Sequence, residues 1–318
     1  MTGSAGQAAS GVKKKIGFLV VACLVSILNI SISGRGAKEK GPDARKQALN
    51  LEDEELFKKY GWTITSQVHS FDLVLPSTFI HEAGEFPIKL YWAYNHELSR
   101  SIGLDFAPYL GEKMRATIYA LSEPWPDAMR PDNKARGVTL RAGPKLVGAY
   151  VHSWRHYKLN CSLDRKQLAE VVKKSWGEWL DGYVDYDNEI EKRLSAMRPE
   201  EIISEYFRAL DRHDWTFSRA CLTRRYLMDR LPIHTDDRYL YHEDYAKGGF
   251  KSAKLISVQE LPYLAKGNPP GTIEYEVICD CIFENPTTLD DGINYIYMIM
   301  ERETARGGWK IGSIGTGP

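Results

Sequence analysis

In the stretch TIEYEVICDCIFE, from Thr272 to Glu284, every second side chain is apolar and most of the positions between them are polar. The side chains expected on one side of it are Ile273, Tyr275, Val277, Cys279, Cys281 and Phe283. Such alternation is the pattern of a strand that has one face on a core and the other toward polar surroundings. Residues 272–284 are therefore predicted to form a strand of an antiparallel sheet packed on one side.

Three neighbouring stretches are also predicted strands: GFKSAKLISVQEL before it, then INYIYMIMERE and WKIGSI after it. INYIYMIMERE is apolar on both faces near its middle, which predicts a strand covered on both sides. Helices come first, because PEEIISEYFRALDRHDW begins at Pro199, a favoured first helical residue, and has one apolar face. A further helical piece around Trp215 follows. We expect a cone-like curved antiparallel sheet packed on these N-terminal helices, an α+β domain spanning residues 199–318.

The earlier part of the chain predicts a second small α+β domain at residues 51–152. LEDEELFKKY and IKLYWAYNHELSRSIG have helical patterns, and WTITSQVHSFDLVL, MRATIYALS, GVTLRA and KLVGAYVHS are strand-like, the last two flanking a Gly143-Pro144 turn. Residues 153–198 are a predicted helical connector. Its apolar residues from Leu168 to Leu180 recur at helical spacing, with Asp164 and Gln167 placed like a capping box.

Several of these stretches resemble known families. PEEIISEYFRALDRHDW, GFKSAKLISVQEL, GTIEYEVICDCIF and GGWKIGSIGTGP resemble the nuclear-transport-factor-two-like superfamily, specifically its domain of unknown function 4829; KKYGW and VTLRAGPKLVGAYV resemble domain of unknown function 4830. The resemblance implies membrane-anchored or secreted proteins of Gram-positive, spore-forming bacteria, and no catalytic residues to transfer. Arg198 stands where similar sequences have Ser or Thr, which removes a side-chain N-cap at a cost of about 1 kcal/mol.

Residues 1–34 predict a signal peptide or a membrane anchor. Lys13, Lys14 and Lys15 precede an apolar run at residues 16–33, whose length lies between that of a signal peptide and that of a span. Lipidation at Cys23 is disfavoured, because the apolar run continues past it. Residues 35–50 predict a flexible tether. We expect a body outside the cytoplasm, either held at the cell membrane or secreted after cleavage.

The charge balance argues against one class of partner. Forty-two basic side chains face forty-two acidic ones, and the globular part has no dense basic block. Nucleic-acid binding is therefore not expected. The expected partners are a small ligand, a peptide or an envelope protein, together with the membrane through residues 16–33.

Four cysteines of the body, Cys161, Cys221, Cys279 and Cys281, are candidates for a disulfide. Cys279 and Cys281 share a strand face, but their Cα atoms lie about 6.6 Å apart, at the edge of disulfide geometry. Buried thiols are the favoured interpretation, with a disulfide to Cys221 or Cys161 as the alternative. We expect no metal and no cofactor.

Other metal-like and phosphate-like patterns are weak. His152 and His156 have a metal-like spacing but follow a strand, so they are interpreted as surface or packing residues. Residues 185–189 begin like a calcium loop, but Ile190 stands where glycine is needed, which favours a solvated acidic connector. The glycines of GGWKIGSIGTGP have no helix after them, so they predict a last strand and not a phosphate loop.

No catalytic signature is present in the sequence, so no catalytic residue is assigned. A cone pocket is expected to have five candidate lining residues: Tyr206, Trp215, Tyr226, Tyr275 and Tyr297. The interpretation that these aromatic residues fill a core is favoured over the interpretation that they line a pocket. Asp211 and His213 are the candidate acid and base if the protein is an enzyme. We expect a non-enzymatic binding or interaction module; the alternatives are a small-molecule isomerase or hydrolase and a structural envelope component.

Overall fold

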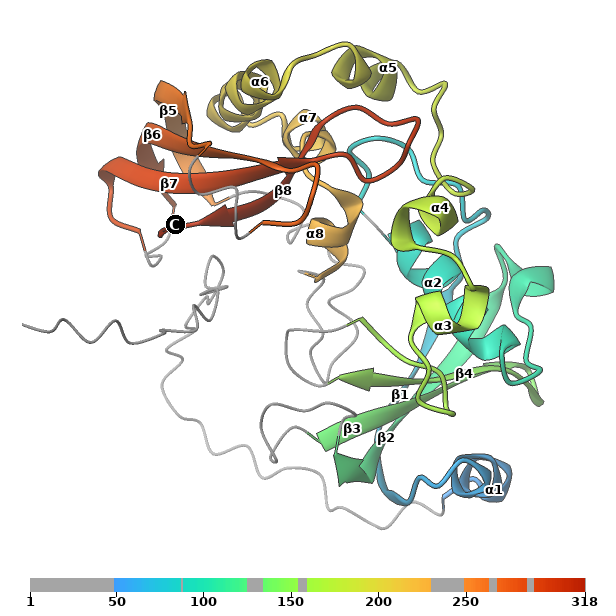
Figure 1. Ribbon diagram of the computed structural model, residues 1–318. Helices are drawn as coiled ribbons and strands as arrows, with labels where there is room; N and C mark the ends of the chain where they lie inside the picture. The colour runs from blue at the N-terminus through green and yellow to red at the C-terminus, as the bar shows by residue number, and fades with distance from the viewer. Residues whose placement is uncertain are drawn as a thin grey trace, which may run out of the picture.

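The computed structural model describes residues 49–86, 88–124, 134–153, 159–229, 249–262, 268–284 and 289–317. These residues form helices and two four-stranded antiparallel sheets, each with its strands in chain order (Figure 1). The α+β class and the two-sheet arrangement expected from the sequence are confirmed. Within the described residues, no helix combines the length and the apolar character needed to cross a membrane. The predicted signal peptide or anchor lies outside them, as does nearly all of the tether.

The first sheet is covered on both faces. Its strands are β1 (Ile64–Val74), β2 (Lys113–Pro124), β3 (Lys134–Ala142) and β4 (Lys145–Ser153). Helix α1 (Leu51–Lys59) brings Phe57 to one face, where it packs with Tyr119. Helix α2 (Ile88–Arg100) packs on the other face, in the cluster that contains Ile118; the short η1 (Ala107–Tyr109) follows it. Consecutive residues of β2, Ile118 and Tyr119, therefore enter two different cores. Figure 1 shows α1 and α2 on opposite sides of the sheet.

A buried carboxylate fixes α1 to this sheet. Asp53 is in the acidic first turn of the helix, yet only 1% of it is exposed. Its carboxylate accepts hydrogen bonds from the hydroxyls of Tyr119 (2.6 Å) and Thr139 (3.0 Å) and from the Arg141 guanidinium (2.5 Å). The Arg141 guanidinium compensates the buried charge. All three partners come from β2 or β3, so these contacts hold α1 on the sheet. The Asn50 side chain caps the helix by accepting from the Asp53 N–H.

The connector differs from the single helical stretch that the sequence suggested. It contains α3 (Leu168–Val172), α4 (Trp176–Leu180) and α5 (Glu189–Ser195), and the first two are separated at Lys173, which has a left-handed φ of 57°. The predicted capping box is also shifted: the Glu170 carboxylate accepts from the Gln167 backbone N–H (2.8 Å), while Asp164 pairs with Lys166. A left-handed residue ends a helix, because the next N–H can no longer reach its helical partner.

The second sheet consists of β5 (Phe250–Glu260), β6 (Ile273–Phe283), β7 (Gly292–Glu301) and β8 (Lys310–Gly315). Helices α6 (Pro199–Asp211) and α7 (Trp215–Ala220) cover one face, and α8 (Arg224–Asp229) lies between the two sheets (Figure 1). The alternation predicted for β6 is confirmed, since Tyr275, Val277 and Cys279 are buried against α6. At the start of α6, the Glu201 carboxylate accepts from the Arg198 N–H (2.8 Å), which satisfies one exposed donor.

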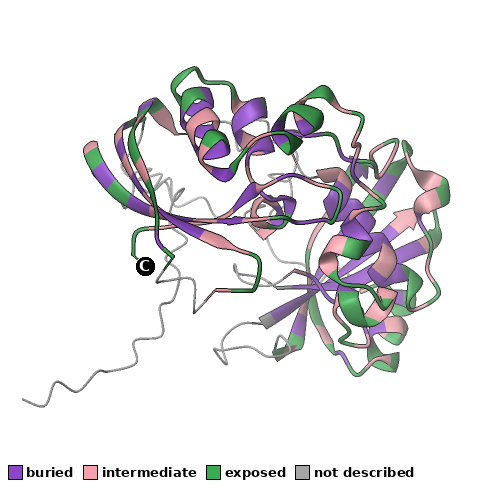
Figure 2. Ribbon diagram, turned by 45° about the horizontal axis from the view of Figure 1, so that its top comes forward, coloured by how far each residue is buried: buried purple, intermediate pink, exposed green. Residues whose placement is uncertain are grey.

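The prediction that β7 is covered on both faces is wrong. Ile296, Met298 and Met300 are buried, but Ile293 and Tyr295 on the other face are 65% and 59% exposed. Exposed and buried positions alternate along these strands (Figure 2). The reason is that α6 and α7 lie on one face only, and no other helix of the described residues covers Ile293 and Tyr295 on the second face.

Candidate functional site at the junction of the two sheets

Where the two halves of the chain meet, each half contributes a buried residue to the core of the other. Ala83, from the loop before α2, is buried in the second core, and Met228, from α8, is buried in the first core. Gly84 sits beside this exchange with a φ of +79°, and its carbonyl accepts from Arg219 Nε (2.8 Å). A Cβ on Gly84 would lie 2.1 Å from the Thr216 carbonyl oxygen. The halves are therefore in direct backbone contact.

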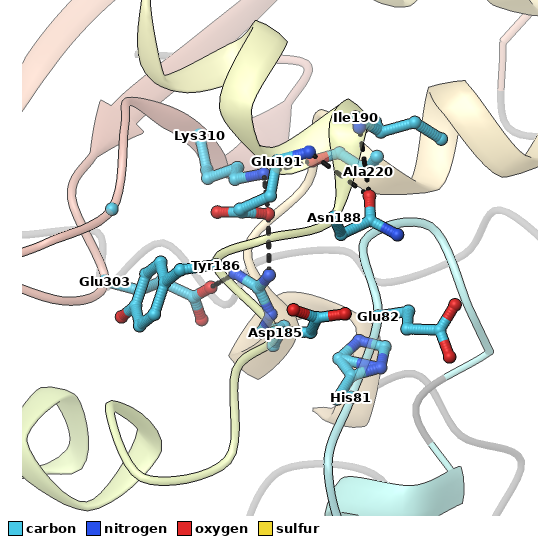
Figure 3. A network of polar contacts seen from close by, with 12 residues as sticks. His81, Glu82, Asp185, Tyr186, Asn188, Ile190, Glu191, Ala220, Glu303 and Lys310 are labelled. Carbon is cyan, nitrogen blue, oxygen red and sulfur yellow. Dashed lines mark hydrogen bonds and ion pairs between the residues drawn. The ribbon is translucent and has the colours of Figure 1, made fainter.

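A short parallel bridge continues this contact into the connector. The His81 N–H donates to the Tyr183 carbonyl (2.8 Å), and the Asp185 N–H donates to the His81 carbonyl (3.0 Å). Burial holds the pKa of His81 well below its usual value, and the positive charges of Arg224, Lys89 and Lys310 lower it further. His81 is therefore neutral at the junction, where its ring lies beside the charged residues described next (Figure 3).

Four buried charged residues from four segments form a compensated cluster. Glu191 Oε2 accepts from Arg224 Nη2 (2.8 Å) and from Lys310 Nζ (3.0 Å), and Arg224 Nη1 also donates to Glu303 (3.4 Å) (Figure 3). Lys310 donates in addition to the Ala220 carbonyl (2.7 Å). Two carboxylates balance two cations, so this cluster joins α5, α8, β8 and the loop before β8 without leaving a net charge.

The pKa directions agree with that description. Burial pushes the pKa of Glu191 upward, but the charges of Arg224 and Lys310 outweigh it and the pKa is lowered. Burial pushes the pKa of Arg224 downward, and Glu191 and Glu303 more than restore it. Burial lowers the pKa of Lys310, with Glu191 opposing the change. Each charge is held by its neighbours, which is typical of a structural cluster more than of a proton-transfer site.

A groove of about 800 Å³ opens next to this cluster, between α2 and the connector helices. Its apolar side includes Val171, Val172, Trp179 and Tyr183. Its charged side includes Glu97, Glu178 and Asp181 together with Arg100 and Lys174. A concave site with an aromatic wall and a few converging polar groups is the usual form of a ligand site.

The groove side chains are fixed by their own contacts. The Tyr183 hydroxyl donates to Glu97 Oε1 (2.9 Å), and the Tyr183 ring packs against Trp179 with centroids 4.9 Å apart. Burial, and then the Glu97 charge, raises the pKa of Tyr183, so the hydroxyl stays neutral. Arg100 donates to Glu97 Oε2 at 3.4 Å and remains 56% exposed. The aromatic wall is therefore rigid, while the guanidinium is free to meet a ligand.

The lining of the groove offers no activated nucleophile. Ser101 supplies a hydroxyl, but this hydroxyl donates to the Leu98 carbonyl (2.7 Å) within its own helix. Nucleophilic catalysis needs a hydroxyl or thiol next to a positioned base. Among the described residues, no group of three or more His, Cys, Asp or Glu is placed to hold a metal ion.

The five aromatic residues expected to line a cone pocket do not form one site. Tyr206 and Tyr275 are buried in the second core, and Trp215 packs against its edge. Tyr297 lies on the opposite face of β7, with its hydroxyl 3.4 Å from Glu276, and Tyr226 is half-buried on α8. Strand alternation separates Tyr297 from the rest, because it follows the buried Ile296.

The candidate acid and base are on the surface. Asp211 is exposed and accepts from the Ala253 N–H (3.1 Å), which ties the end of α6 to β5. His213 is exposed, has a φ of 57° and stacks on Trp215 with centroids 5.2 Å apart. A general acid or base is normally desolvated and borders a cavity. Neither residue has that setting.

All four described cysteines are free and buried, so the disulfide alternative is not what the structure contains. Cys161 is in the first half of the chain, packed with Phe57, whereas Cys221 is in the core of the second sheet. Cys281 Sγ lies 3.5 Å from Cys279 Sγ, at hydrogen-bond distance, because the two side chains share one face of β6.

The remaining candidates have structural surroundings. His152 is buried in β4, and burial, followed by the Arg136 charge, lowers its pKa to about 3; His156 lies outside the described residues. Asp185 accepts from the Asp187 N–H (2.9 Å) inside the connector turn, and Glu189 begins α5. The groove residues Glu97, Arg100 and Tyr183 were missed. The sequence feature that pointed toward the groove was the apolar stripe of the connector, which had to pack against another element. It packs against α2, where the Tyr94 ring contacts the Trp179 ring.

Fold and site together define a two-domain α+β protein with a groove beside a charge-compensated junction. Residues 56–151 match the family described as Domain of unknown function (DUF4830), and residues 200–315 match Domain of unknown function (DUF4829). The chain therefore contains a DUF4830 domain followed by a DUF4829 domain, in the order that the sequence predicts. No curated protein and no solved structure matches it.

Proposed function

We propose that this protein is a non-enzymatic binding module of the bacterial cell envelope, with its body outside the cytoplasm, and that the groove between α2 and the connector receives a peptide segment. The observation that carries the proposal is the groove itself, about 800 Å³, with a fixed Trp179–Tyr183 wall and charges of both signs. Peptide termini and side chains present that same mixture of apolar surface and opposite charges.

The position of the groove supports the proposal. Its two sides come from the first half of the chain and from the connector, and Tyr183 joins them through Glu97. The Tyr186 hydroxyl, one turn further, bonds both to Asp181 in the groove (2.5 Å) and to Thr304 in the loop before β8 (2.6 Å). A ligand in the groove is thus one hydrogen-bonded step from the second sheet, which suits a module that reports binding to a neighbouring domain.

The test is calorimetric titration of the full chain, purified in a neutral detergent, with the dipeptides Gly-Phe, Lys-Phe and Glu-Phe. We expect at least one of them to bind, and Arg100→Ala to weaken that binding at least fivefold because it removes the exposed guanidinium. Arg208→Ala is the matched control, since Arg208 is 51% exposed and pairs with Glu205 just as Arg100 pairs with Glu97. Absence of binding by all three dipeptides, or equal losses in the two variants, would overturn the proposal.

The envelope location is tested separately in intact cells. We expect the full chain to be cut by externally added protease before lysis, and a cytoplasmic marker to stay intact. The location is motivated by the cationic and apolar pattern of residues 1–34. Protection of the chain until lysis would show the body to be inside the cell and would remove this part of the proposal.

A further inference from the structure

The face of the second sheet that points away from α6 and α7 has a contiguous apolar area, here called the outer patch. Its members are Ile278, Ile282, Ile293, Tyr295 and Tyr297. Register places them side by side: Ile278 pairs with Tyr295, and the neighbouring pair is Asp280 with Ile293. Ile293, Tyr295 and Ile282 are 65%, 59% and 42% exposed. Large adjoining apolar side chains left in water usually mark an interaction surface.

The exposed apolar residues elsewhere in the described chain do not gather in this way. Leu51 is on α1, Ile80 is in a loop, and Val68 and Val74 are six positions apart on β1. The remaining one, Ile256, is 54% exposed and lies on β5 of the second sheet, at a register shift next to Ser257, which pairs with Ile278 of the patch. Single exposed apolar residues are normal on a soluble surface and need no explanation. The outer patch is therefore a feature of the second sheet, continuous across β6 and β7.

The charges around the outer patch are mainly negative. Glu276 and Asp280 alternate with its isoleucines on β6. Three exposed carboxylates, those of Glu284, Asp290 and Asp291, lie at the β6–β7 turn next to Ile282 and Ile293. Among the described residues, the cations near the patch are Lys254, opposite Asp280, and Lys251, both on β5. Within this part of the chain, five carboxylates and two ammonium groups therefore lie around the patch.

This charge excess selects among the occupants. A second copy of the chain docked face to face would bring two acidic surfaces together, and an anionic lipid surface would do the same; both contacts are opposed by like-charge repulsion. A cationic partner with an apolar face is favoured by two contributions. Its apolar side chains cover the patch, and its Lys or Arg groups pair with the carboxylates. We propose that the outer patch binds an amphipathic, lysine- or arginine-rich polypeptide segment, independently of the groove.

The experiment uses the full chain in neutral detergent and a fluorescent 18-residue leucine–lysine peptide that carries a photo-crosslinking group, compared with a leucine–glutamate peptide of the same pattern. We expect the lysine peptide to bind more tightly, to crosslink within residues 276–297, and to lose affinity as salt is raised from about 50 to 300 mM, because screening weakens exposed charge pairs. We expect the double variant Ile293→Ser, Tyr295→Ser to weaken binding at least fivefold.

The matched control is Val68→Ser, Val74→Ser, which removes two exposed apolar side chains from the first sheet and leaves binding unchanged. Both double variants are checked for unchanged thermal unfolding, since all four positions are exposed. Equal binding of the glutamate peptide, crosslinks outside the patch, or equal losses in the two double variants would overturn the proposal. Sedimentation that shows a dimer of the unmodified chain, abolished by Ile293→Ser, Tyr295→Ser, would assign the patch to a second copy instead.

Discussion

The two sheets have the same number of strands and the same strand order, yet they are covered differently. The first sheet has α1 on one face and α2 on the other, so its strands contribute to two cores. The second sheet has α6 and α7 on one face, and apolar side chains remain exposed on the other. Strand order therefore does not determine what a sheet is free to contact; the number of packed layers does.

This difference also locates the two candidate interaction sites. In the described part of the first half, helices pack on both sheet faces, and the groove lies between helices, beside α2 and the connector. In the described part of the second half, one sheet face keeps exposed apolar side chains. Four experiments test the contrast and the stability of the chain, ordered from the largest expected effect to the smallest.

Arg224→Met is expected to have the largest effect, lowering the free energy of unfolding by about 3–5 kcal/mol. It leaves the buried carboxylates of Glu191 and Glu303 with Lys310 as the remaining cation of the cluster. Urea unfolding followed by tryptophan fluorescence measures the loss. Arg225→Met, at the exposed neighbouring position, is the control and is expected to change stability by less than about 1 kcal/mol. Similar losses would show that the cluster does not hold the junction.

Alanine at consecutive strand positions separates the two sheets directly. In β2 we expect both Ile118→Ala and Tyr119→Ala to lower the free energy of unfolding by about 2–4 kcal/mol, because each residue is buried in a different core. In β7 we expect Ile296→Ala to lower the free energy of unfolding somewhat less than the two β2 variants do. We expect Tyr295→Ala to lower it by less than about 0.5 kcal/mol. A large loss at Tyr295 would mean that the outer patch is covered after all.

Gly84→Ala tests the contact between the halves. The residue has a left-handed φ, and the new Cβ would meet the Thr216 carbonyl, so we expect a loss of about 2–3 kcal/mol. Gly111→Ala is the matched control, because its φ is +80° but nothing lies within 4 Å of the added Cβ. It therefore measures the cost of the left-handed backbone conformation alone, about 1 kcal/mol of the free energy of unfolding. Thermal unfolding of both variants checks the difference, and equal losses would argue against a tight interface at Gly84.

His152→Phe is expected to change the pH dependence of stability. The pKa of His152 is lowered to about 3 in the folded chain, whereas the unfolded chain takes up the proton near the ordinary value of about 6.5. The stability is therefore fully present above pH 6.5 and is lost as the pH falls, by about 1.4 kcal/mol per pH unit. Urea unfolding between pH 8 and 4 should show a slope reduced by that amount in the variant. An unchanged slope would place the proton uptake elsewhere.

The sequence predicted the local structure well where one pattern dominates. The alternation of residues 273–283, Pro199 at the start of α6 and the hairpin at Gly143 all have a short-range cause, and all are found. Prediction from the sequence failed where the burial of a residue depends on packing against elements that are distant in the chain. The apolar run of β7 suggests cover on both faces, but whether a helix lies over Tyr295 depends on the path of the whole chain. The break between α3 and α4 at Lys173 was also missed, although Ser175 and Glu178 have the spacing of a capping box and do cap α4.

The site was less predictable than the fold. Glu191, Arg224 and Lys310 look like solvated charges in the sequence, and only the long-range contacts of the connector with α8 and β8 bury them together. The groove has the same difficulty, because Glu97 and Tyr183 meet across 86 positions of chain. Periodicity describes which side of an element is apolar, but it does not report which two polar sides converge.

The exchange of Ala83 and Met228 has a consequence for the order in which the protein is made. Translation delivers β1 to β4 long before α8, so the first core lacks Met228 while the connector and α6 are still being synthesised. The second core, in turn, receives Ala83 from a segment made much earlier. Neither domain completes its packing before most of the chain has emerged, so we expect one late cooperative step in place of two successive foldings.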